Sequence, residues 1–430
     1  MESLTKMELP SEEQYLFCIR CGRCLPECPT YRVTLKETHS PRARVMLVRK
    51  FVEGELEPSP NFIDQIYRCL DCLACNEVCP VGIKPADLAL QMRAYFHRTQ
   101  PQPWFKPLLF RGYFPHPGRI ELSMLPVAIY QRLGLQKLLH SLKLNRLFPA
   151  QLRDLERLLP NPIPLRPLRH RLPETIPAQG ERRYRVGFFL GCFQNTVFAE
   201  VSWASIQVLT RNGCEVVMPK DVRCCGMPHI GYGDIPTFVE LARYNISLFE
   251  GLVVDAIVTD CATCGSTLKE YGKYLGDDPK WAERAQKFSG KVRDVSEFLV
   301  EIGFEEPARQ LRARVTYHDP CHLRRGQGVW KEPRQVIEAA VTDFIEMEAP
   351  DTCCGAAGTQ LITHYETSVA ILDGKMERVA ATGAEILAAG CPGCQLQLGL
   401  GIQHRNLKMR VVHPVQLLAE AYGFAGAKGL

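Results

Sequence analysis

The sequence predicts a mixed α+β and α/β protein, with an α-helical N-terminal domain followed by two repeated α/β units built on parallel sheets. The first 100 residues hold eight cysteines in two matching runs, and five further cysteines recur at a nearly constant offset in the second half of the chain. Around the recurring cysteines, short apolar runs alternate with helical patterns, which is typical of parallel βα units.

The N-terminal region contains two complete four-cysteine motifs, CIRCGRCLPECP and CLDCLACNEVCP. Each matches the C-x-x-C-x-x-C-x-x-x-C-P run of bacterial ferredoxins, whose fourth cysteine ligates the other cluster. A pair of zinc sites is the alternative, because C-x-x-C pairs also bind zinc. We therefore expect two cubane [4Fe-4S] clusters, one held by Cys18, Cys21, Cys24 and Cys79 and the other by Cys69, Cys72, Cys75 and Cys28.

The spacing between the motifs favours a helical ferredoxin-like domain over residues 1–100. The 40 residues between Cys28 and Cys69 exceed the insertion of a small ferredoxin, and Ser40-Pro41 opens a helical pattern. The cations that could lie near the clusters and raise their potentials are Arg42, Arg44 and Lys84, although such residues are more often merely solvated.

A basic, proline-rich segment, residues 101–182, is expected to connect the domains. It holds 13 of the 31 prolines, and residues 101–180 contain 12 Lys and Arg against 4 Asp and Glu. Leucines near helical spacing predict a helical connector over residues 133–159, and NPIPLRPLRHRLPE then predicts an extended linker. Its charges, together with Trp104, Phe105, Phe110, Tyr113 and Phe114, suggest contact with anionic lipid or an acidic partner. The alternative is a linker wrapped on its own domains.

The second half of the chain contains two copies of one cysteine pattern. Residues 183–305 hold Cys192, Cys224, Cys225, Cys261 and Cys264, and residues 306–430 hold Cys321, Cys353, Cys354, Cys391 and Cys394. The offset is 129 residues for the first three pairs and 130 for the last two, which chance does not explain. Each cysteine group follows an apolar run, and the carboxyl ends of parallel strands share one edge of a sheet. We therefore expect the five thiols of each copy to converge, with positive φ at Gly226 and Gly355.

Each copy resembles the cysteine-rich CCG domain of heterodisulfide reductase subunits and of the iron-sulfur subunits of glycolate oxidases and D-lactate dehydrogenases. The resemblance rests on a cysteine, the CCG triplet and a C-x-x-C pair, over residues 184–425. It implies that a five-cysteine set holds a [4Fe-4S] cluster, which can be non-cubane, and that a degenerate copy binds zinc or nothing. Neither copy is degenerate, so up to two further clusters are expected, with zinc in one pocket as the lesser alternative.

The sequences of the two copies favour different functional interpretations. Many glycolate oxidase subunits lose cysteines in the first copy, whereas this chain keeps Cys261 and Cys264 in DCATCG, which favours heterodisulfide-reductase-like chemistry. The second copy's CCGAAGT and CPGCQLQLG instead resemble the glycolate and lactate branch. Three histidines close to cysteines could tune a cluster, although structural roles are more common: His229, His318 and His322. Cys214 lies outside both repeats and is expected to be buried.

The preferred functional interpretation is an iron-sulfur electron-transfer subunit of a FAD-dependent glycolate or D-lactate dehydrogenase. No nucleotide fingerprint follows a predicted strand, so the hydride step must lie in a FAD-containing partner subunit, and no catalytic residue can be assigned here. The acceptor would be an electron-transfer flavoprotein, a membrane quinone or another carrier. The alternatives are a subunit that cleaves a disulfide at non-cubane clusters and a zinc-stabilised scaffold.

Composition limits the location and the partners. A net charge of +5 is too small to indicate nucleic acid. Residues 1–15 are polar and acidic without the apolar run of a signal peptide, and the longest uncharged stretch, residues 386–404, contains Gln, Pro and His. We expect a cytoplasmic protein without a transmembrane helix, with peripheral attachment to the inner face of the cytoplasmic membrane as an option. In that compartment, clustered thiols bind metal rather than pair.

Overall fold

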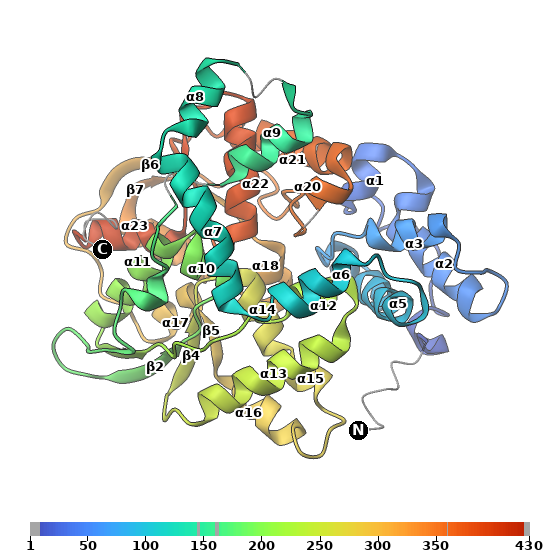
Figure 1. Ribbon diagram of the computed structural model, residues 1–430, viewed down its shortest axis with the longest axis horizontal. Coiled ribbons are helices and arrows are strands. Elements are labelled where there is room, and N and C mark those ends of the chain that lie inside the picture. Colours follow the sequence, from blue (N-terminus) through green and yellow to red (C-terminus); the bar gives the residue numbers. More distant parts are fainter. Residues whose placement is uncertain (1–8, 144–146, 160–162, 359, 425–430) are drawn as a thin grey trace.

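The computed structural model describes residues 9–143, 147–159, 163–358 and 360–424. These residues form a helical N-terminal domain at one side of the molecule and two α/β units (Figure 1). A helical connector runs from the N-terminal domain over the two α/β units. The predicted fold class is confirmed.

The N-terminal domain is built from short helices around a compact apolar core. Ser40 caps α2 as predicted, because its hydroxyl accepts a hydrogen bond from the amide of Ala43. Val48, Ile66 and Met92, from three different helices, meet in the core. The elements are η2 (Glu12–Gln14), α1 (Pro29–Thr34), η3 (Glu37–His39), α2 (Pro41–Val52), α3 (Pro60–Tyr67), α4 (Ala74–Glu77) and α5 (Pro85–Thr99).

The connector differs from its sequence prediction. The sequence did not predict the helix α7, which contains Pro126. Within residues 133–159, the described residues form two helices, α8 and α9, and Gly134, with φ of 71°, precedes the first; residues 144–146 lie outside the described residues. The expected extended linker, residues 161–174, contains a helical turn, η6, and the strand β1 follows it directly; residues 161 and 162 lie outside the described residues. The elements are α6 (Phe105–Pro107), the π-helical η4 (Leu108–Tyr113), α7 (Pro117–Arg132), α8 (Leu135–Ser141), α9 (Ala150–Leu158), η6 (Leu168–His170) and β1 (Thr175–Ile176).

The first α/β unit is organised on a sheet with the order β1-β3-β2-β4-β5. Strands β2 to β5 are parallel, and β1, which comes from the connector, pairs antiparallel with β3. The elements are β2 (Tyr184–Phe188), α10 (Cys192–Thr196), α11 (Ala199–Arg211), β3 (Cys214–Val217), α12 (Met227–Tyr232), α13 (Ile235–Glu250), β4 (Ala256–Thr259), α14 (Ala262–Lys269), α15 (Tyr271–Tyr274), α16 (Ala282–Lys291), β5 (Val292–Asp294) and α17 (Val295–Glu301).

The second α/β unit repeats this topology with a parallel sheet in the order β7-β6-β8-β9. This order corresponds to β3-β2-β4-β5, so the repeat of cysteines is also a repeat of structure. The strands are shorter than the apolar runs, since β3 ends at Val217, well before Cys224. The elements are β6 (Leu311–His318), α18 (Cys321–Gln327), α19 (Glu332–Ala340), β7 (Val341–Phe344), α20 (Gln360–Thr363), α21 (Tyr365–Ala381), β8 (Ile386–Ala389), α22 (Pro392–His404), β9 (Arg410–Val412) and α23 (Pro414–Ala421).

The two α/β units share one hydrophobic core. Val186 and Val216 of the first sheet belong to the same buried cluster as Val315 and Ile386 of the second. Helices α11 and α17 of one unit pack against α23 and α19 of the other inside it. Because both sheets depend on this cluster, the units hold each other in a fixed orientation.

Candidate functional site

Four cysteines of the N-terminal domain line one small cavity. Cys28 comes from the first motif, and the second motif provides the other three, Cys69, Cys72 and Cys75. All four are buried. The fold therefore brings the last cysteine of one motif to the first three of the other.

Arg44 is the cation closest to this cavity. Its guanidinium lines the cavity and lies 4.0 Å from the sulfur of Cys28, while its Nε donates to the carbonyl of Gln65 at 3.1 Å. The side chain is buried. A buried cation beside a set of thiolates would stabilise their negative charge, so the position of Arg44 is compatible with the electrostatic role considered from the sequence. Lys84 is exposed.

The two cysteine loops share an unusual backbone conformation. In the first motif, Arg20 and Gly22 have φ of 54° and 81°; at the matching positions of the second motif, Asp71 and Leu73 have φ of 50° and 61°. Left-handed backbone at non-glycine residues costs about 1–3 kcal/mol and concentrates at functional sites. Both loops contain such residues, next to the second cysteine of each motif.

The first motif is the more open of the two. Cys21 is exposed, and Cys18, Cys24 and Cys79 are half-buried. Burial raises the pKa of the Cys24 thiol to about 11. Arg42 pairs with Glu37, and its Nη1 donates to the carbonyl of Arg20 at 3.5 Å. This partly exposed side chain therefore contacts the loop of the first motif.

The spacing and burial of these thiols fit a metal cluster. Among the described residues, no three cysteines of the two N-terminal motifs have sulfur atoms that all lie within 4.8 Å of one another. One zinc ion would hold them about 3.8 Å apart, given Zn–S bonds of about 2.3 Å. Burial also raises the pKa of Cys72 to about 12, and a metal ion bound at this thiol would favour its deprotonated form.

The five cysteines of the first α/β unit follow three adjacent parallel strands. Cys192 begins α10 after β2, the Cys224–Cys225 pair follows β3, and Cys261 follows β4 and caps α14, where its sulfur accepts from the amide of Cys264 at 3.4 Å. Hydrogen bonds from the thiols of Cys224 and Cys264 hold the pKa of Cys225 well below its usual range. The sequence prediction that these thiols would gather at one edge of the sheet agrees with this arrangement.

The glycine after each cysteine pair has the predicted conformation. Gly226 has φ of 95° and Gly355 has φ of 89°. Any Cβ at Gly226 would collide with the ring of Phe238, and one at Gly355 would lie 2.7 Å from the carbonyl of Ser368. Only glycine fits at either position.

The second five-cysteine set follows β6, β7 and β8 in the same way. The sulfur atoms of Cys354 and Cys394 are 3.5 Å apart, and a hydrogen bond from Cys394 lowers the pKa of Cys391 to about 6. His318, the last residue of β6, has its ring within 4.8 Å of both of the closely spaced sulfurs.

The other two histidines have structural partners. The Nε2 of His229 lies 2.7 Å from the carbonyl of Phe110, which joins α12 to the connector. His322 pairs with Asp71 at 3.4 Å across the boundary between the second α/β unit and the N-terminal domain. Burial opposes its charged form, yet the hydrogen bond to Asp71 raises the pKa of His322. Cys214 is buried in β3, as expected.

The cysteine sets adjoin one another. Cys72 of the N-terminal cavity lies in one apolar cluster with Cys321 and Cys353 of the second five-cysteine set. On the other side of that set, the hydroxyl of Thr263 is 3.3 Å from the sulfur of Cys391, and the amide of Ala262 donates to the carbonyl of Gly390 at 3.0 Å. The order in space is therefore the first motif, the N-terminal cavity, the second five-cysteine set and the first five-cysteine set.

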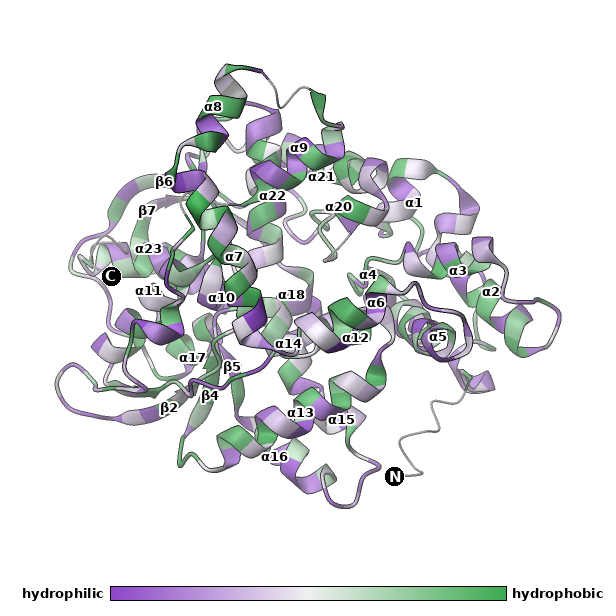
Figure 2. Cartoon of the chain, viewed as in Figure 1, coloured by the Kyte–Doolittle hydropathy of each residue, from purple (hydrophilic) through white to green (hydrophobic). Residues whose placement is uncertain are grey.

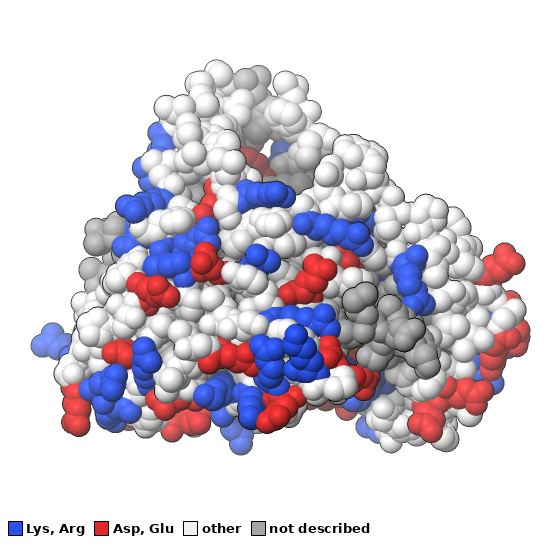
Figure 3. Space-filling view, turned by 60° about the horizontal axis from the view of Figure 1, so that its bottom comes forward, with Lys and Arg blue, Asp and Glu red and all other residues white. Residues whose placement is uncertain are grey.

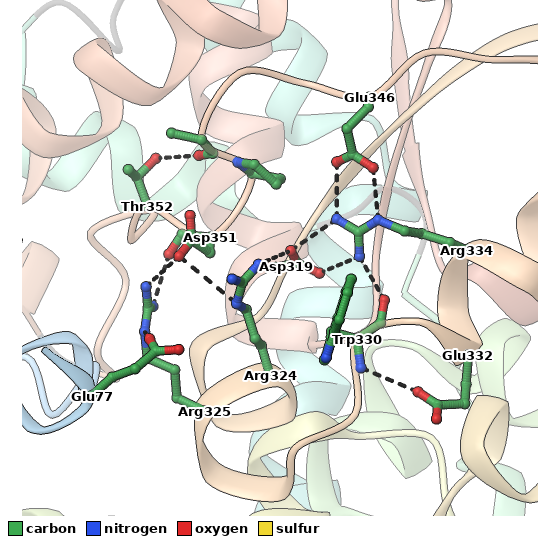
Figure 4. Close-up of polar contacts among 12 residues, drawn as sticks. Glu77, Asp319, Arg324, Arg325, Trp330, Glu332, Arg334, Glu346, Asp351 and Thr352 are labelled. Carbon is green, nitrogen blue, oxygen red and sulfur yellow. Dashed lines mark hydrogen bonds and ion pairs between the residues drawn. The ribbon is translucent and has the colours of Figure 1, made fainter.

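A charged network fastens the N-terminal domain at this junction (Figure 4). Arg325 of α18 donates to Glu77 of α4 at 2.8 Å and pairs with Asp351 at 2.5 Å, two residues before Cys353. Within the second α/β unit, Arg334 forms an ion pair with Asp319 at 2.9 Å. No sequence pattern marks these residues, because the partners lie far apart in the chain.

The connector uses part of its charge internally and exposes apolar side chains. Lys106 lies 5.4 Å from the ring centre of Tyr67, and Arg169 pairs with Glu121. Hydrophobic segments on α8 lie at the outer edge of the molecule (Figure 2). Among the exposed apolar side chains are Trp104, Phe105, Leu108, Leu122, Leu133 and Leu138. Lys and Arg are interspersed with Asp and Glu over the middle and lower parts of the face in Figure 3, whereas the top of that view carries few charges.

No helix within the described ranges is long and apolar enough to cross a membrane. The predicted absence of a transmembrane helix therefore agrees with the described part of the chain.

Family models match most of the chain. A 4Fe-4S dicluster domain matches residues 14–83, the glycolate oxidase iron-sulfur subunit linker region matches residues 101–159, and the cysteine-rich CCG domain matches residues 186–269 and 315–399.

Curated relatives agree with these matches. A probable glycolate oxidase iron-sulfur subunit of Bacillus subtilis (strain 168) is 39% identical over 97% of this chain and 96% of its own length. The glycolate oxidase iron-sulfur subunit of Escherichia coli (strain K12) is 28% identical over 89% of both chains. Lactate utilization protein A of Bacillus subtilis (strain 168) is 30% identical over 54% of this chain and 98% of its own. This chain belongs to the family of glycolate oxidase iron-sulfur subunits.

Proposed function

We propose that this chain carries electrons from a FAD-containing subunit that oxidises glycolate or D-lactate to an electron-transfer flavoprotein, a quinone or another acceptor. As a family member it is an iron-sulfur electron-transfer subunit of an oxidoreductase with a separate catalytic subunit. The names of its relatives, a glycolate oxidase subunit and a lactate utilization protein, support the choice of a 2-hydroxy acid as substrate.

The N-terminal domain holds two cubane [4Fe-4S] clusters in this proposal. The shared cavity supports exchange of the fourth ligand between the motifs, and the matching left-handed loops support equivalent clusters. The ligands are Cys18, Cys21, Cys24 and Cys79 for the outer cluster, and Cys69, Cys72, Cys75 and Cys28 for the inner one.

Each α/β unit holds one further metal centre, bound by the five cysteines that follow its strands. Their burial and the glycine turns at Gly226 and Gly355 support this assignment. Iron-sulfur clusters are the preferred occupants, and zinc in one unit is the lesser alternative. The proposed division of the chain is 1–100, 101–182, 183–305 and 306–430, although β1 at residues 175–176 already pairs with the first sheet.

The observation that carries the proposal is the unbroken series of cysteine sets. Cys72 packs with Cys321 and Cys353, and Thr263 contacts Cys391, so within the described residues the N-terminal cavity adjoins the second five-cysteine set and the second set adjoins the first. Such an arrangement suits stepwise transfer of single electrons over short distances. A substrate-binding catalytic role does not require it.

Anaerobic affinity purification of the full chain, with identification of its partners, tests this proposal. We expect a flavoprotein to co-purify, and glycolate or D-lactate added to the complex to bleach the iron-sulfur absorption. A colourless, zinc-loaded chain would refute the redox proposal altogether. A flavoprotein complex that either acid leaves oxidised would refute the substrate assignment.

Disulfide cleavage is the second candidate function. It is favoured by the completeness of the first five-cysteine set, which includes Cys261 and Cys264, and by its contact with the second set through Thr263. The chain, kept reduced by excess dithionite, should then convert glutathione disulfide to two molecules of glutathione over multiple turnovers, faster than dithionite alone. If it does not, electron relay remains the better account.

We also propose that the protein is cytoplasmic and attaches peripherally to the inner face of the cytoplasmic membrane. Exposed Trp104, Phe105 and Leu108 on a connector with excess positive charge support this placement. Sedimentation with anionic vesicles should be reversed by high salt and weakened when Trp104 is replaced by Glu. Equal sedimentation with neutral vesicles would argue against the electrostatic part of the attachment.

A further inference from the structure

The two repeats differ at one position beside their cysteines. His318 lies three residues before Cys321, and the matching residue of the first repeat, three before Cys192, is Phe189. Phe189 is fully buried and stacks on Phe249 with ring centres 5.9 Å apart. The first repeat therefore has an apolar ring where the second has an imidazole.

His318 is buried, with 1% of its surface exposed, and its polar atoms are unsatisfied. Neither Nδ1 nor Nε2 has a hydrogen-bond partner in the described part of the chain. A buried imidazole normally donates from one ring nitrogen and accepts at the other, because an unpaired polar atom in the interior loses its hydration without compensation. Both nitrogens therefore lack a hydrogen bond of ordinary geometry, and the group with which the imidazole interacts is the thiol of Cys354.

The atoms that face this imidazole are sulfur ligands. One ring nitrogen lies within 4.8 Å of the sulfur atoms of Cys354 and Cys394, which are 3.5 Å from each other. A tetrahedral metal with bonds of about 2.0–2.3 Å spaces its donor atoms about 3.3–3.8 Å apart. The two sulfurs already meet this spacing, and the nitrogen lies within 4.8 Å of both.

We propose that His318 is a ligand of the metal centre in the second α/β unit, binding through a ring nitrogen beside the thiolates of Cys354 and Cys394. The inference rests on the proposed presence of a metal in the five-cysteine sets. It makes the second centre a mixed imidazole and thiolate site, whereas the first, with Phe189, has thiolate ligands alone.

The second set keeps all five cysteines, so His318 would add a neutral donor to five thiolates and would leave the total ligand charge equal to that of the first set. The two centres would then differ in the kind of donor atoms that surround the metal. Imidazole with thiolate suits an iron-sulfur cluster and also a single zinc ion, and the metal itself distinguishes these two occupants.

The test uses the full chain, purified anaerobically, as wild type and as His318→Phe, which introduces the residue of the first repeat. Iron and zinc contents are measured, and X-ray absorption at both metal edges with pulsed EPR detects nitrogen bound to metal. We expect one nitrogen donor in the wild type, at iron or at zinc, and its complete loss in His318→Phe. The edge at which the nitrogen appears identifies the metal.

Two further variants keep the test falsifiable. His318→Cys supplies another thiolate, so it should retain the metal without the nitrogen signal. Phe189→Leu alters the matching position of the first repeat and should leave the nitrogen signal intact. Unchanged visible absorption of the N-terminal clusters would show that each variant is folded.

The outcomes separate this inference from the function proposed above. A metal-loaded second unit whose nitrogen signal survives in His318→Phe would overturn the role of His318 alone. A wild-type chain with about eight iron atoms for its two N-terminal clusters, and no other metal, would overturn both this inference and the occupancy of the five-cysteine sets.

Discussion

Replacing Arg44 with methionine is expected to lower the reduction potential of the inner N-terminal cluster by about 100 mV. The guanidinium lies 4.0 Å from the sulfur of Cys28, and unit charges at that distance interact by about 4 kcal/mol at an effective dielectric constant of about 20. The added electron is spread over irons farther from the guanidinium, so we take about half of this energy. About 2.3 kcal/mol corresponds to 100 mV for one electron.

The sign follows from the charge. A buried cation stabilises the reduced cluster, which carries one more negative charge, so its removal makes reduction harder. The assay is a redox titration of the purified chain followed by EPR, in which only one of the two N-terminal signals should shift.

Two controls accompany this variant. Arg44→Lys keeps a positive charge and should recover most of the potential. Arg42→Met removes a half-exposed cation that is already paired with Glu37, and solvent screening should leave a much smaller shift. The electrostatic reasoning would be refuted if Arg44→Met retained both clusters with potentials equal to those of the wild type.

Three further predictions concern stability. Gly226→Ala should lower the free energy of unfolding by about 2–4 kcal/mol in denaturant titrations, through left-handed backbone strain and a clash with Phe238, whereas Gly231→Ala in the open should not lower it. Arg325→Ala should lower the free energy of unfolding by about 1–2 kcal/mol and slow electron transfer out of the N-terminal domain, because half-exposed Glu77 loses its partner and Asp351 keeps the longer contact with Arg324 at 3.8 Å; unchanged rates would exclude the second effect. Burial raises the pKa of Asp294 to about 7, so between about pH 4 and 7 the folded chain binds a proton that the unfolded chain has released, and stability falls as the pH rises. Asp294→Asn should therefore gain up to about 4 kcal/mol at pH 8 and nothing below pH 4, and equal gains at both would contradict the assignment.

Local sequence signals predicted the parts of the molecule whose geometry depends on neighbouring residues. Ser40-Pro41 specified a helix start because both the cap and the fixed φ act within one turn. The cysteine repeat specified equivalent places in two sheets, because a thiol that follows a parallel strand always lies at the same edge. Gly226 was predictable since only glycine tolerates its conformation.

The features that the sequence did not predict depend on contacts between segments far apart along the chain. Arg93 donates to the carbonyls of Cys69 and Gly231, so it joins the cysteine loop to the first α/β unit, yet in the sequence it is one arginine of an ordinary helix. Strand β1 has two residues and is defined by its antiparallel pairing with the edge of β3. In α7, Pro126 suggests a break, but tertiary packing keeps the helix continuous through it. The left-handed conformation of Asp71 has no local signal either.

The cysteine sets also differ in how easily oxidants from the solvent can reach them. Cys21 is exposed and its three partners are half-buried, whereas the thiols of the inner cavity are buried and those of the five-cysteine sets are mostly so. Dioxygen and peroxide that diffuse from solvent therefore meet the outer cluster first. Brief contact with air should leave a chain whose deeper centres survive but whose outermost one is degraded. Repair would then need to rebuild only the cluster that solvent can reach.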